Sequence, residues 1–318
     1  MIRKITLSLM AGLLIGMAGC FPEVESELQT AIDRDDRLLA DYLSRNNINA
    51  TETQLGYFYK KEISNETGNQ IVNNDIIGVY YEIRTIDGQL IEAYTDESKS
   101  PKIYKHSEGG LIPRAINFAS GLAKTGETFA LYIPSYLAYQ EYSYQQLILP
   151  NSNLVVKVKY AKTYTNAEIK EMEEESILKY ISDKNLEGFT RTADSIYVKT
   201  VKEGEAASKV TINGDVISFT YKILQLDSET PIAQSTGNTP FQATLGSESN
   251  PKFLNLSLKG LKKGQEIEAI IPSRIGYGLT VQVFPFSIRR DLVDKGYINQ
   301  IARPFEPIIF KVTVTNIR

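Results

Sequence analysis

The chain has 318 residues, with 35 basic and 38 acidic side chains and a formal net charge of −3. No basic stripe stands out, so nucleic acid is not expected as a partner. One histidine and one cysteine exclude an ordinary zinc site, and they leave a single histidine for any Ser-His-Asp arrangement. We therefore expect a globular protein that uses no metal and no cofactor. His106 lies in a polar loop and is expected to be solvated.

Residues 1–20 have the pattern of a targeting segment. Arg3 and Lys4 precede an apolar run over Ile5–Met17, which is too short to span a bilayer comfortably and ends in Met-Ala-Gly-Cys. This ending resembles the lipobox of bacterial lipoproteins. We expect Cys20 to carry lipid and to hold the protein at the outer membrane, on its periplasmic face or at the cell surface. The alternative is an uncleaved signal anchor with an incidental cysteine.

An amphipathic helix is expected within residues 21–50. Apolar side chains recur there at spacings of three and four, with acidic residues and arginines between them. They are Val24, Leu28, Ala31, Ile32, Leu38, Leu39, Tyr42 and Leu43. Asp33–Asp36 is a candidate break in this helix.

A second amphipathic helix is expected within residues 165–186. Its apolar stripe consists of Ile169, Met172, Ile177, Tyr180 and Ile181. Thr165 or Asn166 can cap its start, with Glu168 in the first turn. One expectation is that each helix packs on its own domain or on the other helix. The alternative is that it serves in dimerisation or docking.

The two helices belong to an internal repeat. Tyr42 and Tyr180 lie 138 positions apart, and Tyr81 and Tyr221 lie 140 apart. The repeated unit is therefore a helix followed by a domain. After the leader and the first helix, this divides the chain into a domain over residues 51–164, a connecting helix over 165–186 and a second domain over 187–318.

Each domain is predicted to be an antiparallel sheet curled around a short helix, which is an α+β fold. Aromatic and β-branched runs such as GYFYKKEI and SIYVKTV suit such a sheet. Asp87-Gly88 is a turn between two strand-like runs. The short helices are expected near Pro113–Ser120 and Phe253–Lys259.

Glycines and prolines punctuate the middle of each repeat. One pair of glycines is expected to end the short helices in the left-handed conformation, and a second pair to form a turn at positive φ. Gly121 and Gly260 are the pair that should end the helices, and Gly126 and Gly264 are the pair that should form the turn. An apolar strand is expected after each of these turns. Pro134 and Pro272 lack the backbone N–H that the strand pairing needs, so each should end the strand that precedes it.

The order of these motifs resembles the FKBP-type peptidyl-prolyl isomerases. The family's central block, with Gly-Met-Lys-x-Gly-Glu and then Ile-Pro-x-x-Leu-Ala-Tyr-Gly, is similar to Gly110–Gln140 and Asn250–Gly278. Its opening strands resemble residues 73–94 and 213–235, and its closing strand resembles residues 149–164 and 303–318. The resemblance implies two tandem FKBP-like domains, each with a proline pocket.

The resemblance also assigns pocket residues, although each ring could equally be an ordinary aromatic of a sheet core. In the second domain it gives Tyr221, Ile232, Phe241, Leu254, Tyr277 and Phe310, where Ile232 replaces a family phenylalanine and Leu254 falls near a family tryptophan. In the first domain it gives a weaker set, Tyr81, Tyr104, Ile112 and Tyr139. There Ala115 or Ile116 falls at the tryptophan and Val156 at the last phenylalanine. The second domain is thus the better candidate for a working pocket.

Two functions stay open on the sequence. The first is a lipid-anchored isomerase and chaperone of the cell envelope, acting on prolyl-containing exported or outer-membrane proteins. The second is a catalytically degenerate binding module that serves as an accessory subunit of an outer-membrane complex. The missing Phe-Asp and tryptophan groups favour the second function, and the retained rings of the second domain favour the first.

Residues 279–300 contain an insertion of about sixteen residues relative to the first domain, because 27 steps separate Tyr277 from Pro304 but 11 separate Tyr139 from Pro150. The insertion contains the apolar run VQVFPFSI and then a helix-compatible stretch, whereas a solvated loop would be polar. One interpretation is a cover over the proline pocket beside it or an apolar contact for a partner. The other is a satellite core of its own, built on Phe284 and Phe286.

Overall fold

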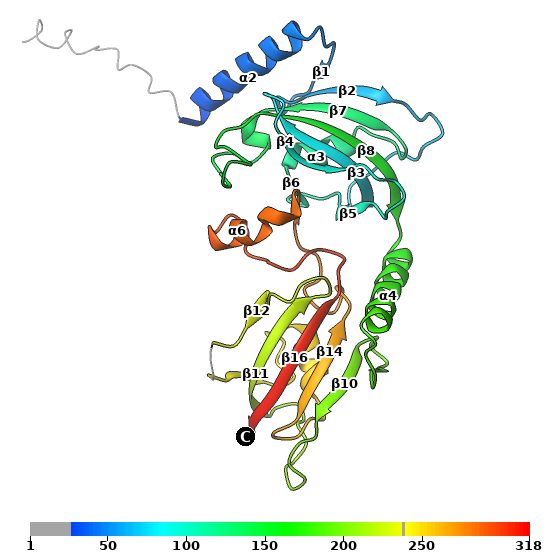
Figure 1. The fold of residues 1–318 in the computed structure, drawn as a ribbon, viewed down its shortest axis with the longest axis vertical. Coiled ribbons are helices and arrows are strands. Elements are labelled where there is room, and N and C mark those ends of the chain that lie inside the picture. The colour runs from blue at the N-terminus through cyan, green and yellow to red at the C-terminus, as the bar shows by residue number, and fades with distance from the viewer. Residues whose placement is uncertain (1–26, 237–238) are drawn as a thin grey trace, which may run out of the picture.

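The computed structural model describes residues 27–236 and 239–318, so Cys20 lies outside the described part. Two domains of the same topology follow one another, and helix α4 (Asn166–Asp183) runs between them (Figure 1). Within the described residues, no helix has the length and apolar character needed to cross a membrane.

Domain 1 is a seven-stranded antiparallel sheet that curls around a short helix. The helix is α3 (Arg114–Ser120), and Tyr160 on the sheet donates a hydrogen bond of 2.9 Å to its Ile116 carbonyl. The strands along the sheet are β1 (Thr51–Glu52), β2 (Phe58–Ile63), β7 (Thr128–Ile133), β8 (Leu154–Tyr164), β3 (Ile76–Thr85) and β4 (Leu90–Tyr94), with β5 (Lys102–Lys105) also on β3.

Domain 2 repeats this topology around helix α5 (Lys252–Leu258). In the corresponding order its strands are β9 (Thr190–Arg191), β10 (Tyr197–Lys202), β14 (Glu266–Ile271), β16 (Ile308–Ile317), β11 (Val216–Gln225) and β12 (Ala233–Gln234), with β13 (Phe241–Thr244) also on β11. The predicted α+β fold with tandem curled sheets is confirmed.

Most of the predicted punctuation is found. Strands β7 and β14 end at the residue before Pro134 and Pro272. Three of the four glycines have positive φ, +85° at Gly126, +82° at Gly260 and +78° at Gly264. Gly121 does not, since its φ is −67°. Gly121 lies five positions before Gly126, whereas Gly260 lies four before Gly264, so Leu122 and not Gly121 stands at the position of Gly260. The turn in domain 1 is closed by the amides of residues 122 and 123, which bond to the carbonyls of residues 119 and 120.

His106 is partly buried rather than simply solvated as expected. Its Nδ1 atom lies 3.0 Å from Asn117 Oδ1 and 3.0 Å from Ser120 Oγ, so polar side chains of α3 hold the ring. The polar composition of its loop did not reveal these partners, because they lie on the helix that follows.

The first helix, α2 (Glu27–Arg45), continues through Asp33–Asp36 without the expected break. Asp35 is fully buried there, and its carboxylate accepts a 2.8 Å hydrogen bond from the Ser135 amide in the 3-10 turn (Ser135–Leu137) after β7. The same contact recurs in domain 2, where Glu173 of α4 accepts a 2.8 Å bond from the Ser273 amide. A buried carboxylate thus fixes each helix to the loop after the Ile-Pro pair of its own domain.

Helix α4 packs on both domains. Thr165 caps its start in a capping box with Glu168, as the sequence indicated. Ile177 is buried with Tyr197, Ile270 and Ile309 of domain 2. Nearer the start of the helix, Ile169 is buried with Ile76 and Tyr164 of domain 1. The helix therefore joins the two domains as well as covering its own.

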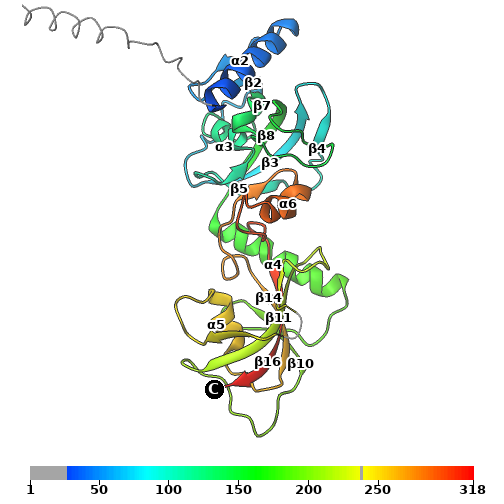
Figure 2. The same cartoon turned by 90° about the vertical axis from the view of Figure 1, so that its left-hand side faces the viewer.

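The insertion leaves domain 2 and lies against domain 1 (Figures 1 and 2). Its strand β15 (Gln282–Val283) pairs in parallel with β6 (Leu111–Ile112), just before α3. A 3-10 turn (Phe286–Ile288) and helix α6 (Arg289–Asp294) follow. The Ile112–Pro113 and Phe284–Pro285 peptide bonds are cis. Four insertion residues, Val283, Phe284, Ile288 and Leu292, are buried in the same cluster as the core of domain 1.

The contact between Glu173 and Ser273 can be tested by substitution. Glu173→Ala leaves the buried Ser273 amide without its partner, which should lower the free energy of unfolding by about 1–3 kcal/mol. Glu173→Gln keeps an acceptor and should cost less. The measurement is urea denaturation followed by circular dichroism, with Glu171→Ala on the exposed side of α4 as the matched control. Equal stabilities of Glu173→Ala and Glu171→Ala would contradict this role.

Candidate functional site

In domain 2, the six assigned residues come together on the concave side of the sheet. Leu254 of α5 and Phe310 of β16 are buried, and Tyr221, Ile232 and Tyr277 pack against the same cluster. Phe241 stands at the edge with 51 % of its surface exposed, and its ring centroid lies 6.1 Å from that of Tyr221. These side chains form an aromatic bowl with one exposed edge.

Two further rings complete the bowl of domain 2, and the family resemblance did not supply them. Phe219 lies between Phe241 and Tyr221, with ring centroids 5.6 Å and 6.0 Å away. Phe253 contacts Phe310 at 5.2 Å and Tyr277 at 6.0 Å. Strand alternation could have revealed Phe219, which stands two positions before Tyr221 on the same face.

The bowl contains two hydroxyls, those of Tyr221 and Tyr277. Burial, and to a smaller extent the neighbouring Tyr221, raises the pKa of Tyr277 to about 12, so the hydroxyl stays protonated at neutral pH. No group among residues 27–236 and 239–318 forms a hydrogen bond with it. An apolar bowl with a protonated, unengaged hydroxyl can accept a proline ring and donate a hydrogen bond to a nearby carbonyl.

In domain 1, the weaker set also comes together. Tyr81, Tyr104 and Tyr139 are at most 5 % exposed, and Ile112 of β6 packs against their cluster. Here, however, a side chain of domain 2 occupies the space between them. The ring of Phe284 is fully buried and stacks on Tyr81 with centroids 4.1 Å apart and planes 25° apart.

The backbone around Phe284 is engaged as well. The Tyr139 hydroxyl donates a 2.7 Å hydrogen bond to the Phe284 carbonyl. The Tyr81 hydroxyl donates a 2.5 Å bond to Glu92, and the backbone amide of Phe286 bonds to the same carboxylate. Burial raises the pKa of Glu92 against the effect of these hydrogen bonds and of Lys102. The Tyr139 hydroxyl is therefore bonded to domain 2, and the carboxylate that accepts from Tyr81 is shared with domain 2.

The two pockets differ at two positions that decide their size. The short helices both start after a proline, Pro113 and Pro251, so Ala115 of α3 corresponds to Phe253 of α5. In the sheets, Val156 pairs with Ile83 as Phe310 pairs with Ile223. Domain 1 thus has an alanine and a valine where domain 2 has two phenylalanines. The smaller side chains leave space that the ring of Phe284 fills.

Neither interpretation of the insertion describes this arrangement. The insertion does not form a core of its own, because Phe284 belongs to the core of domain 1. It enters a proline pocket, but the pocket is that of the other domain. The pairing of β15 with β6 directs it there, and the sequence carries no local signal for a parallel pairing between segments so far apart.

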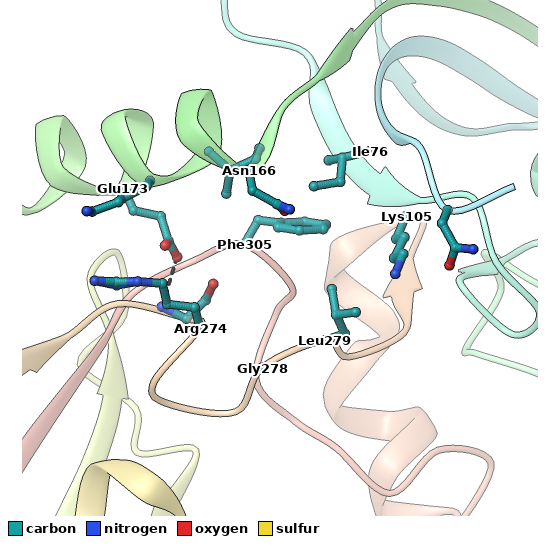
Figure 3. A pocket seen from close by; sticks show the side chains of 12 residues that line it. Ile76, Lys105, Asn166, Glu173, Arg274, Gly278, Leu279 and Phe305 are labelled. Carbon is teal, nitrogen blue, oxygen red and sulfur yellow. Dashed lines mark hydrogen bonds between the residues drawn. The ribbon is translucent and has the colours of Figure 1, made fainter. Parts of the chain in front are cut away.

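A separate cavity of about 520 Å³ lies between the domains (Figure 3). Helix α4 lines one side with Asn166 and Glu173, and the loop at Gly278 and Leu279 lines the other. Phe305 is the one aromatic side chain among its lining residues. None of the assigned pocket residues lines this cavity, and it lacks the aromatic walls of a proline site.

Comparison with known proteins agrees with this geometry. The family model described as FKBP-type peptidyl-prolyl cis-trans isomerase matches residues 68–161 and 208–315, one match in each domain. The chain belongs to this FKBP-type family. Each of its two FKBP-type domains contains one of the pockets described above.

Individual relatives are more distant. The chain is 30 % identical over 130 residues to a probable FKBP-type isomerase FkpA of Neisseria meningitidis, and the match covers 41 % of this chain and 45 % of that protein. Among solved structures, the three FKBP domains of wheat FKBP73 match at 19 % identity and a TM-score of 0.33, covering 85 % of this chain and 99 % of that one. FkpA of Escherichia coli matches at 21 % identity and a TM-score of 0.35, and the match covers 51 % of this chain and 73 % of that one. The chain thus spans less than half of the curated relative.

The two pockets should respond differently to loss of a ring. Phe284→Ala empties a fully buried site and should lower the free energy of unfolding by about 3–5 kcal/mol. Phe241→Ala removes a ring that is half exposed and should cost about 1 kcal/mol or less. Urea denaturation of both variants beside the parent chain measures the difference. Similar losses in both variants would show that Phe284 is not a core residue of domain 1.

Proposed function

We propose that the protein is a peptidyl-prolyl isomerase whose working pocket lies in domain 2. The observation that carries the proposal is the Tyr277 hydroxyl, which stands over an aromatic bowl without a partner among the described residues, whereas the corresponding Tyr139 in domain 1 is bonded to Phe284. Membership of the FKBP-type family supports the same reaction.

The chemistry requires no nucleophile. Rotation about a prolyl amide faces a barrier of roughly 18–20 kcal/mol that comes from amide resonance. An apolar bowl made by Tyr221, Phe241 and Phe310 holds the proline away from water, where the less polar, twisted amide is favoured over the planar one. Tyr277 donates a hydrogen bond to a carbonyl next to the proline and fixes its orientation.

We place this activity at the cell envelope. The proposal rests on the leader and on Cys20, whose thiol would accept the lipid that anchors the mature chain to the outer membrane. The substrates would be prolyl-containing exported or outer-membrane proteins. They would meet the pocket while still unfolded, since a proline inside a folded protein cannot enter the bowl.

A second function is supported by a specific observation. In domain 2, Ile232-Ala233 replaces the Phe-Asp pair of the family, and Leu254 falls where the family has tryptophan. A pocket without these groups can bind a prolyl segment without accelerating its isomerisation. In that case both domains would serve as binding modules, and the protein would be an accessory subunit of an outer-membrane complex.

An isomerase assay separates the two functions. With a prolyl peptide and the soluble mature chain, Tyr277→Phe should lower kcat/KM by about three- to tenfold, the worth of one hydrogen bond. Phe241→Ala should lower it by about tenfold or more, because the bowl becomes larger and wetter. Tyr42→Phe on α2 is the matched control. Activity that survives both pocket substitutions would refute the site, and a parent chain without activity would favour the accessory subunit.

Lipid attachment can be tested separately. Cys20→Ser should leave the protein unacylated and release it from the membrane fraction, because acylation requires the thiol and stable anchoring requires the acyl chains. Membrane fractionation and mass spectrometry of the mature N-terminus give the readout. A parent protein with a mature N-terminus at another residue and no attached lipid would contradict the proposal.

A further inference from the structure

The pocket of domain 1 holds residues 282–286, which we call the guest strand, as a peptide-binding domain holds a ligand. The Gln282 amide donates a 2.9 Å hydrogen bond to the Gly110 carbonyl, and the Phe284 amide donates another of 2.9 Å to the Ile112 carbonyl. Main-chain bonds to a short strand combined with a pocket for one side chain are the features of strand-addition binding.

The side chains of the guest strand are recognised individually. Phe284 is the anchor, since it is fully buried against Tyr81. The side-chain amide of Gln282 donates a 2.7 Å hydrogen bond through its Nε2 atom to the Ile103 carbonyl. The ring of Phe286 lies under the Lys102 ammonium group, 4.1 Å from its centroid. Val283, between Gln282 and Phe284, is also fully buried in the core cluster of domain 1, so successive side chains of the guest strand are covered.

The insertion is built to present the guest strand. Arg289 is buried, and its guanidinium group donates to the Val281 carbonyl at the start of the insertion and, at 3.1 Å each, to the Gln300 and Ala302 carbonyls at its end. The arginine thereby closes the insertion into a loop with the guest strand on one side. Outside the pocket, the Tyr142 hydroxyl of domain 1 donates a 2.8 Å bond to Asp291.

Host and guest also match in volume. Ala115 and Val156 make the domain 1 pocket larger than that of domain 2, and the incoming ring restores an aromatic interior. Without the ring of Phe284, the small side chains of domain 1 would leave a buried cavity, and such cavities lower the free energy of unfolding.

We propose that the pocket of domain 1 is a binding site for an extended apolar strand with phenylalanine before proline, and that its resident ligand is this chain's own guest strand. The guest closes the domain 1 pocket to prolyl substrates and locks the two domains together. This inference goes beyond the proposed function and does not depend on whether domain 2 is catalytic.

Peptide binding in trans tests the proposal. The host is the mature chain with residues 281–296 deleted, which shortens the insertion to about the length found in domain 1. The probe is a fluorescent peptide with the sequence of residues 280–288, TVQVFPFSI, followed by fluorescence anisotropy. The peptide should bind the deleted chain and should bind the intact chain at least tenfold more weakly, because the guest strand occupies the site. Equal binding to both chains would overturn the proposal.

Two matched controls locate the binding site. A peptide with alanine in place of Phe284 should bind the deleted chain at least tenfold more weakly. Tyr139→Phe in the deleted chain should weaken binding of the parent peptide, whereas Tyr42→Phe on α2, outside both pockets, should not change it. A folded deleted chain that fails to bind the peptide would also overturn the proposal.

Hydrogen exchange in the full-length chain decides the matter if the deleted chain does not fold. The amides of Gln282 and Phe284 donate to domain 1 carbonyls and should exchange slowly in the parent chain. Tyr139→Phe removes the bond to the Phe284 carbonyl and should speed their exchange at least threefold, with Tyr42→Phe as the control. Fast exchange of both amides in the parent chain, or no effect of Tyr139→Phe, would show that the guest strand is not held by the pocket.

Discussion

The ring of Phe284 inside domain 1 is the contact on which the relation between the two domains depends. It comes from domain 2, yet it is buried in the core of domain 1 with Tyr81 stacked on it. Aromatic burial of this size is among the larger favourable contributions that one side chain can make. Helix α4 adds a second connection, because its two ends pack on different domains. The domains are thus joined by shared cores rather than by a flexible linker.

The two domains show how one scaffold gives two kinds of site. Their strand order, the turns at Gly126 and Gly264 and the carboxylate that holds each preceding helix are the same. The difference lies in a few side chains of the concave face. Phe253 and Phe310 fill the bowl of domain 2 with rings of its own, whereas Ala115 and Val156 leave room for a foreign ring. Fold alone therefore does not decide whether such a pocket is available to a substrate.

The sequence was informative wherever the signal was local. The Ile-Pro pairs, the turn at Gly126 and the capping box at Thr165 depend on neighbouring residues, and each was predictable. The position of the guest strand was not, because it depends on contacts between residues 145 positions apart, such as Tyr139 and Phe284. The apolar content of the insertion indicated that it must be covered, but periodicity says nothing about which surface covers it. The partners of His106 were missed because they, too, are distant in the sequence, at 11 and 14 positions.

The position of Phe284 has a consequence for biosynthesis. A ribosome completes domain 1 more than a hundred residues before it reaches the guest strand, and domains made first generally begin to fold first. Domain 1 therefore emerges with a hollow that its own residues cannot fill, and its last core side chain arrives only when most of domain 2 has been made. Loss of the distal part of the chain would then damage the proximal domain as well. The two domains look separable in the sequence, but domain 1 can complete its core only after residues of domain 2 have been made.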